Sequence, residues 1–208
     1  MTTITIVTPW KNGREFARDY FQAVNAADAA HIVVDDHSDP PLPNALNPGE
    51  RFGFSGCSNV GFEAARTDAV LFLNNDIVAH ARDWIEPIRD MLEPGVFVGA
   101  QLRYDPHGMV DGQPMPYIDG WCLAGMTDDL ETLGAWDETF DEPSYYGDND
   151  LSFRARLAGI TLKEARVPII HLRDTKPPVI PSQHIQEVTL KNKARFEARV
   201  RDALGVAA

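Results

Sequence analysis

The segment Ala69-Val70-Leu71-Phe72-Leu73-Asn74-Asn75-Asp76 decides the fold class of this 208-residue chain. Its first five residues are apolar without interruption, which is typical of a β-strand buried on both faces of a parallel sheet. Two asparagines and an aspartate follow at once. Ligands of open α/β sheets bind beyond the carboxyl ends of the strands, so the segment also predicts where the functional site lies.

Strand and helix patterns alternate on both sides of this segment. Apolar runs predict strands over residues 4–8, 31–34, 96–102, 160–166 and 169–171. Apolar residues at helical spacing predict helices over residues 13–30, 59–66, 84–92, 127–133, 148–157 and 182–204. Stretches rich in proline and glycine predict loops over 38–49 and 104–116. The alternation indicates an α/β domain with a mostly parallel central sheet flanked by helices.

Carboxylates stand at the ends of two of these strands. Asp35 and Asp36 follow the 31–34 run, and one of them could accept hydrogen bonds from a nucleobase or ribose, or could form a turn. Asp76 follows the 69–73 run. Mg²⁺ or Mn²⁺ bound to a diphosphate takes one or two protein carboxylates, so Asp76 could be such a ligand or an ordinary loop residue.

Two further places carry candidate residues. Asp148, at the start of the 148–157 helix, could be a general base that takes the proton of an acceptor hydroxyl, or a helix cap. Asp150 and Arg154 are four residues apart and could pair on one helix face. His171, at the end of the 169–171 run, could be structural, complete a metal site or bind a phosphate.

The charge balance and the cysteine count exclude several classes of protein. The chain has 19 Lys+Arg and 31 Asp+Glu, a net charge of −12 and a pI near 4.8, which argues against nucleic-acid partners. Cys57 and Cys122 are too few for a disulfide scaffold and form no Cys-x-x-Cys zinc motif. The N-terminal run lacks the basic region of a signal peptide, and no apolar stretch has the length of a transmembrane segment. We therefore expect a cytoplasmic protein.

Six motifs, taken in this order, resemble those of the family two glycosyltransferases, and in particular their rhamnosyltransferase-like branch. The first three are Ile4–Asn12 with its Pro-x-x-Asn, Val33–Asp39 with its Val-Asp-Asp, and Gly53–Gly61, similar to Gly-Phe-Ala-Gly-x-x-Asn-x-Gly. The others are Leu71–Asp76, similar to a DXD metal motif, Leu133–Phe140, similar to Gly-Gly-Phe-Asp-Glu-x-Phe, and Asp148–Arg154, similar to the Glu-Asp-x-Asp-Leu-x-x-Arg segment that carries the base.

The resemblance implies a single GT-A (Rossmann-like) domain over residues 1–180, followed by a C-terminal helix over 181–208. Within the domain, residues 1–102 would bind a nucleotide sugar and residues 103–180 an acceptor. The implied activity is an inverting, metal-dependent transfer of a hexose from a nucleotide-diphosphate sugar, a UDP- or dTDP-sugar, to an acceptor hydroxyl.

The resemblance also implies roles for individual residues. Asp148 would be the catalytic base. Asp76 would hold Mn²⁺ or Mg²⁺ on the diphosphate, and His171 would complete that metal site. The nucleotide sugar would contact Pro9, Asn12, Asp35, Asp36, Asn59, Arg66, Asn75 and Asp76.

The acceptor and the assembly stay open at this point. Aromatic faces suit sugar rings, and the second half of the chain offers several, although most of them would be expected in the core. We expect Trp121, Tyr146 and Asp150 to contact a glycan, lipid-linked or protein acceptor. The sequence does not fix the oligomeric state, a homodimer included.

Departures from the family pattern leave two other functions open. Gly147 replaces the Glu that precedes the base, and Asp76 is the one charged residue of its metal motif. Arg173 and Lys176 follow the last apolar run and could instead meet the diphosphate. One alternative is a non-catalytic binder of nucleotide sugars or glycans on the same fold. The other is a nucleotidyltransferase, although residues 9–14 hold one glycine where that class carries a Gly-rich basic loop.

Overall fold

A six-stranded mixed sheet forms the centre of the computed structural model, which describes residues 1–140, 142–175 and 182–205. Its strands are β1 (Ile4–Trp10), β2 (Ala30–Asp35), β3 (Ala69–Leu73), β5 (Val96–Gly99), β10 (Cys122–Met126) and β11 (Thr161–Glu164). Their order is β11-β5-β10-β3-β1-β2, and β10 runs antiparallel between β3 and β5, whereas the other neighbours pair in parallel. The expected mostly parallel sheet is confirmed, with one antiparallel strand that was not predicted.

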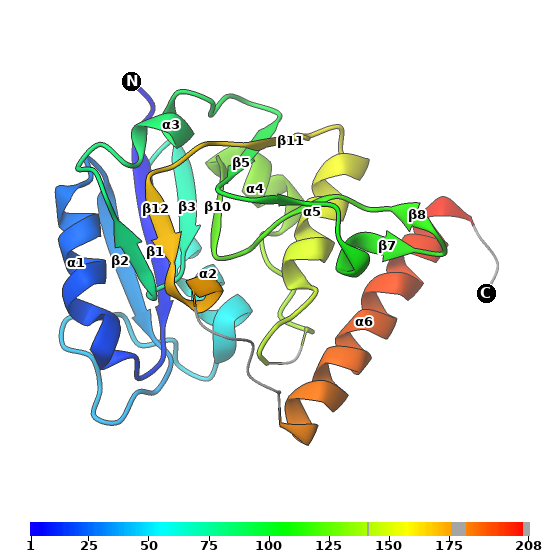
Figure 1. The fold of residues 1–208 in the computed structure, drawn as a ribbon, viewed down its shortest axis with the longest axis horizontal. Coiled ribbons are helices and arrows are strands. Elements are labelled where there is room, and N and C mark those ends of the chain that lie inside the picture. The colour runs from blue at the N-terminus through cyan, green and yellow to red at the C-terminus, as the bar shows by residue number, and fades with distance from the viewer. Residues whose placement is uncertain (141, 176–181, 206–208) are drawn as a thin grey trace.

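Helices cover both faces of this sheet (Figure 1). Alternate side chains of a strand point to opposite faces. Leu71 and Leu73 of β3 therefore join a core with α1 (Ala17–Ala26), α3 (Glu86–Arg89) and β4 (Ile77–Ala79). Val70 and Phe72 join a second core with α2 (Gly53–Ala64), α4 (Thr127–Leu133) and α5 (Gly147–Leu157). Because both faces are covered, the 69–73 run is apolar throughout.

Shorter elements complete the described part of the chain. They are the 3₁₀ helices η1 (Arg14–Phe16), η2 (Pro106–Gly108) and η3 (Leu172–Thr175), and the strands β6 (Leu102–Arg103), β7 (Met109–Val110), β8 (Gln113–Pro114), β9 (Tyr117–Ile118) and β12 (Ile169–His171). β12 pairs with β4, β6 with β9, and β7 with β8. Among the helices of the described ranges, none is both long and apolar enough to cross a membrane.

The last helix, α6 (Gln183–Leu204), lies beside α5 (Figure 1). Phe196 and Val200 are buried in a third apolar cluster with Phe153 and Tyr146. The helix predicted over 182–204 is thus present as α6. Of the predicted 181–208 segment, residues 181 and 206–208 lie outside the described residues.

Helix α2 begins at Gly53, six residues before the predicted helix over 59–66. Glycines and serines fill its first turns, and both favour helices weakly, so propensity conceals this start. Packing of α2 against the sheet, and not intrinsic helix propensity, stabilises the helix here. A Cβ on Gly61 would lie 2.3 Å from a methyl carbon of Val7, so the glycine lets α2 approach β1 closely.

Other predicted boundaries are wrong for local reasons. The predicted helix over 13–30 is η1 followed by α1, because the chain already enters β2 at residue 30. The helix over 84–92 shortens to α3, and the strand over 96–102 separates into β5 and β6. The predicted loop over 104–116 contains η2 and a hairpin of β7 and β8, whose turn residues Asp111 and Gly112 both have positive φ.

Candidate active site

The carboxyl end of β2 leads to a buried carboxylate, that of Asp36. It accepts a hydrogen bond from Lys11 Nζ at 2.9 Å and another from the N–H of Gly53, at the start of α2. Burial alone would raise the pKa of Asp36, but these hydrogen bonds and one from His37 hold that pKa below its usual range. Asp36 is therefore a charged acceptor where β1, β2 and α2 meet.

The neighbouring Asp35 and Asn12 hold a loop. The Asp35 carboxylate accepts a hydrogen bond from the N–H of Leu42 at 3.0 Å, and Asn12 Oδ1 accepts one from the N–H of Asp39 at 3.0 Å. Both side chains thus shape the segment after β2. Of the two predicted aspartates, Asp35 forms the turn and Asp36 contacts Lys11.

Pro9 and Asn75 lie near the same edge of the sheet. Pro9 pairs with Val34 in the ladder between β1 and β2. Asn75 lies beside Gly13, because a Cβ on Gly13 would be 2.6 Å from Asn75 Nδ2. The structure therefore brings both residues to the edge at which we expect the nucleotide sugar.

Asp76 and His171 form a second cluster at this edge. β12 pairs with β4 so that His171 stands opposite Ile77, which brings its Nε2 within 3.1 Å of Asp76 Oδ1. Asn74 Nδ2 lies 3.4 Å from the same nitrogen. The indole of Trp121 stacks on the imidazole, with ring centroids 4.9 Å apart and planes 5° apart. These contacts fix the position of the His171 ring.

The pair of Asp76 and His171 suits a divalent cation that is shared with a substrate. Within the described ranges, no three His, Cys, Asp or Glu side chains gather closely enough to hold a metal by themselves. A carboxylate and an imidazole supply two ligands, and a cation on a nucleoside diphosphate takes the others from phosphate oxygens and water. The donor set therefore fits a metal–diphosphate complex better than a closed structural site.

Asp148 lies in the first turn of α5, half-buried. Its Oδ2 accepts a hydrogen bond from the N–H of Gly120 at 3.0 Å. Burial raises the pKa of Asp148, and the nearby Asp119 carboxylate raises it further, to about 7, although backbone N–H groups oppose the shift. The carboxyl group therefore exchanges its proton near neutral pH, which suits a general base.

A cavity of about 880 Å³ connects Asp148 with His171. Its walls come from the 103–119 segment, the start of α5, the chain after β12 and the first half of α6. Arg173 lines it, with its guanidinium 5.3 Å from the ring centroid of Tyr145. Arg173 could thus meet an anionic group there, whereas Lys176 lies outside the described residues.

The three predicted acceptor residues have different surroundings. Tyr146 lines the cavity, and its hydroxyl lies 3.1 Å from His107 Nδ1. Trp121 adjoins the cavity through its stack on His171. Asp150 has no exposed side-chain surface, and its carboxylate is bound by Arg154 and Arg199, whose side chains are 20% and 35% exposed. An acceptor cannot reach it, so its predicted role is corrected to a structural one.

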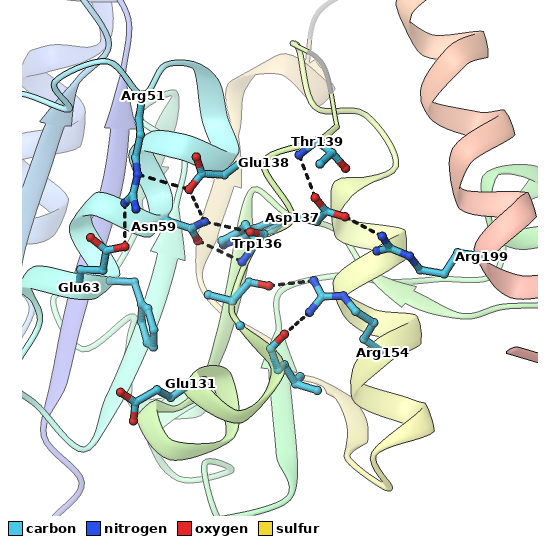
Figure 2. A pocket seen from close by; sticks show the side chains of 14 residues that line it. Arg51, Asn59, Glu63, Glu131, Trp136, Asp137, Glu138, Thr139, Arg154 and Arg199 are labelled. Atoms are coloured by element: carbon cyan, nitrogen blue, oxygen red, sulfur yellow. Dashed lines mark hydrogen bonds and ion pairs between the residues drawn. The ribbon is translucent and has the colours of Figure 1, made fainter.

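Asn59 and Arg66 do not join these clusters. Figure 2 shows Asn59 in a separate cavity of about 720 Å³, where its amide donates to the Trp136 carbonyl at 2.9 Å and accepts from the Trp136 N–H at 3.0 Å. Arg66 is exposed and precedes β3, at the edge opposite Asp76, where it donates to backbone carbonyls at the end of α2. The positions of these two side chains do not support their predicted contact with a nucleotide.

Lys11 and Asp119 are site residues that the sequence patterns did not single out. Lys11 directly follows β1, where parallel strands present ligand-binding side chains, so its position was a usable signal. Asp119 precedes the antiparallel strand β10, which was not predicted. No sequence pattern therefore placed it beside Asp148.

Solved structures of glycosyltransferases share this fold. The mannosyltransferase PcManGT from Pyrobaculum calidifontis, in complex with GDP-Man and Mn²⁺, has a TM-score of 0.60 and 15% identity, over 100% of this chain and 76% of that one. A Drosophila β-1,4-galactosyltransferase 7 mutant, in complex with manganese, UDP-Gal and xylobiose, has a TM-score of 0.58 and 12% identity, over 89% and 79%. TarS of S. aureus has a TM-score of 0.54 and 14% identity, over 78% of this chain and 35% of its own.

The sequence comparisons add no family assignment, since no protein-family model and no curated protein matches the chain. The structural likeness shows that the chain has the GT-A fold, which confirms the fold expected from the six motifs. The rhamnosyltransferase-like branch stays a prediction.

Proposed function

We propose that this chain is a metal-dependent glycosyltransferase that moves a sugar from a nucleotide-diphosphate sugar to an acceptor hydroxyl, with inversion at the anomeric carbon. One observation carries the proposal. Asp148 and His171 line the same cavity, and His171 also contacts Asp76. The base for the acceptor and the metal-binding pair for the donor diphosphate would therefore lie at the same cavity.

The donor nucleotide would bind where β1, β2 and α2 meet. Asp36 offers a charged carboxylate to ribose hydroxyls, and Lys11, whose side chain is 61% exposed, offers a cation. The structural neighbours in complex with GDP-Man and UDP-Gal support a nucleotide sugar as the donor class. Within that class, the family resemblance favours a UDP- or dTDP-sugar.

Asp76 and His171 would hold the metal, Mn²⁺ or Mg²⁺. When bound, the cation neutralises negative charge that develops on the departing diphosphate. An imidazole ligand suits Mn²⁺ better than Mg²⁺, which prefers oxygen ligands and keeps several waters. Two of the structural neighbours contain manganese, which agrees with this preference.

The transfer itself needs one proton acceptor, Asp148. The acceptor oxygen would form its bond to the anomeric carbon while its proton passes to Asp148, and the nucleoside diphosphate would leave from the opposite face. Attack opposite the leaving group inverts the anomeric centre. The pKa of Asp148, about 7, makes its carboxylate a stronger base than an exposed aspartate.

The donor and acceptor halves would be residues 1–102 and 103–180. Asp36 and Asp76 belong to the first range, and Asp148 belongs to the second, which supports this division. The central sheet contains strands of both ranges, with β10 between β3 and β5. The two halves would therefore act as parts of one domain.

A thermal-shift panel of UDP-, dTDP- and GDP-hexoses, with and without Mn²⁺, tests donor binding. A bound ligand stabilises the folded state by mass action, so we expect a rise in Tm that needs both the sugar nucleotide and Mn²⁺. Asp76→Ala should remove the Mn²⁺-dependent part of the rise, and Asp90→Ala, at an exposed position, should keep it. If no donor gives a Mn²⁺-dependent rise, the proposal is overturned.

Release of nucleoside diphosphate separates an enzyme from a non-catalytic binder. With water as the acceptor, the wild type should hydrolyse the bound donor slowly. Asp148→Asn should lower this rate about 10²- to 10⁴-fold, the usual contribution of a general base, and leave donor affinity nearly unchanged. Tight donor binding without any release would favour the binder, and wild-type turnover by Asp148→Asn would remove the base assignment.

A further inference from the structure

The side chain of Arg199, on helix α6, forms an ion pair with Asp150 of the helix that carries Asp148. Its Nη1 donates to Asp150 Oδ1, and its Nη2 donates to Asp137 Oδ2 at 2.7 Å. Figure 2 shows this guanidinium extending from α6 to Asp137. We propose that Arg199 is a positioning residue, which holds the first turn of α5 so that Asp148 points into the cavity. The inference rests on the proposed role of Asp148 as the base.

Each oxygen of the Asp150 carboxylate pairs with a different arginine, Oδ1 with Arg199 and Oδ2 with Arg154. The Asp150 side chain has no exposed surface, and its second oxygen, Oδ2, accepts from Arg154 Nε at 2.7 Å. The other nitrogens of Arg154 donate to the carbonyls of Leu133 and Ala135 at 2.7 and 2.8 Å. Without Arg199, one oxygen of a buried carboxylate would lose its cation, which is costly in a protein interior.

The first turn of α5 is held from three sides. Asp148 accepts from the N–H of Gly120 at 3.0 Å, and Asn149 Nδ2 donates to the His107 carbonyl at 3.1 Å. Asp150 binds the arginines. Successive helical residues are about 100° apart around the axis, so Asp150 stands nearly opposite Asp148. The ion pairs of Asp150 therefore fix the rotation of this turn about the helix axis, and with it the direction of the Asp148 side chain.

Other contacts keep α6 in place when Arg199 is changed. Phe196 and Val200 are buried against α5 and its surroundings. Further along, Arg201 forms two hydrogen bonds, of 2.7 and 2.8 Å, to Asp111 in the turn between β7 and β8. Arg201 thus belongs to the same helix but pairs away from α5, which makes it a matched control.

The test compares Arg199→Gln with Arg201→Gln in donor hydrolysis, with the UDP-, dTDP- and GDP-hexose panel, Mn²⁺ and water as the acceptor. Arg199→Gln should lower kcat about 10- to 100-fold, the range expected when a reacting group is displaced by about 1 Å, and should leave the KM for the donor within about twofold. Arg201→Gln should change neither constant. Arg199→Lys should recover part of kcat, because it restores the cation without the planar fork.

A double variant covers the case in which Arg199→Gln does not fold. Asp150→Asn combined with Arg199→Gln removes the buried charge together with its partner, so the fold keeps no unpaired carboxylate. Both changes break the same contact. We therefore expect the kcat of the double variant to be no lower than that of Asp150→Asn or Arg199→Gln, whichever single variant has the lower kcat. If a folded Arg199→Gln protein or the double variant keeps the kcat of Arg201→Gln, the inference is wrong. A wild type that releases no nucleoside diphosphate would instead overturn the proposed function.

Discussion

Trp121 stacks flat on His171, with ring centroids 4.9 Å apart, while the same imidazole lies 3.1 Å from Asp76. The indole thus fixes the orientation of a proposed metal ligand. Groups that orient metal ligands affect metal affinity about 10- to 100-fold when they are removed. Here an aromatic face helps to set the ring plane, beside the contacts of His171 Nε2 with Asp76 and Asn74.

Trp121→Leu should therefore weaken Mn²⁺ binding about tenfold, because the imidazole loses its platform. Titration of Mn²⁺ in the presence of UDP, followed by electron paramagnetic resonance, measures the effect. His171→Ala should weaken binding further, and His80→Ala, which removes an exposed imidazole, should not. Equal Mn²⁺ affinity of Trp121→Leu and the wild type would show that the stack does not orient the ligand.

The rate of transfer should depend on pH through Asp148. Its pKa of about 7 means that the carboxyl group is mostly protonated, and inactive as a base, below that pH. At saturating Mn²⁺, kcat/KM should rise with pH and level off above the pKa. Asp119→Asn should move the inflection to lower pH, because the Asp119 charge is one of the two causes of the raised pKa. An unchanged inflection would assign the titration to another group.

The same pKa predicts a pH-dependent stability. In the unfolded chain, Asp148 has a pKa of about 3.9, so between about pH 4 and 7 the folded state holds a proton that the unfolded state has lost. The charge of Asp148 therefore destabilises the folded state progressively over that window and fully above it. Asp148→Asn should be more stable than the wild type, on the order of 2 kcal/mol at pH 8, and little changed at pH 4.

Urea denaturation in EDTA at both pH values measures this difference. Asp90→Asn removes an equal charge from an exposed position and controls for the change in net charge. A stability difference between Asp148→Asn and the wild type that is the same at pH 4 and pH 8 would contradict the raised pKa.

The sequence predicts the parallel strands better than the antiparallel one, for a physical reason. Residues 69–73 are buried on both faces and are apolar without interruption, so their pattern is plain. β10 is nearly as buried, but its fourth residue is Gly125, where Phe97 packs with a ring carbon 2.5 Å from where a Cβ would lie. A glycine that the packing requires breaks the apolar run by which a strand is recognised.

The candidate site likewise contains residues that the sequence indicates and residues that it does not. Asp76 and Asp148 follow or begin regular elements, so local sequence indicates them. The pair of Asp150 and Arg199 is 49 residues apart, and it joins two helices whose relative position no periodicity encodes. The acidic motif around Asp148 could be found from the sequence, whereas the ion pair that we propose to orient it could not.

Asn59 should prove to be a structural residue. Its amide satisfies both the N–H and the carbonyl of Trp136 and also donates to Glu138 at 2.8 Å (Figure 2). Asn59→Ala leaves these groups without partners and should destabilise the protein by about 1–3 kcal/mol, with the affinity for UDP and Mn²⁺ unchanged. Urea denaturation and calorimetry measure the two quantities, with the exposed Asn25→Ala as the control. A loss of UDP affinity at wild-type stability would restore the nucleotide-binding role.

Gly61 should resist even the smallest side chain. In an open helix, Gly→Ala stabilises by up to about 1 kcal/mol, but here the added carbon would lie 2.3 Å from a methyl of Val7, which has no exposed surface. Gly61→Ala should therefore destabilise the fold by about 1–3 kcal/mol, the usual cost of overpacking. Gly147→Ala, whose Cβ would have no neighbour closer than 3.7 Å, should cost much less.

Because Val7→Ala removes the clashing methyls, the double variant with Gly61→Ala should lose less free energy of unfolding than the two single variants added together. Urea denaturation of the four variants measures this, and strict additivity would mean that Val7 is not what requires the glycine.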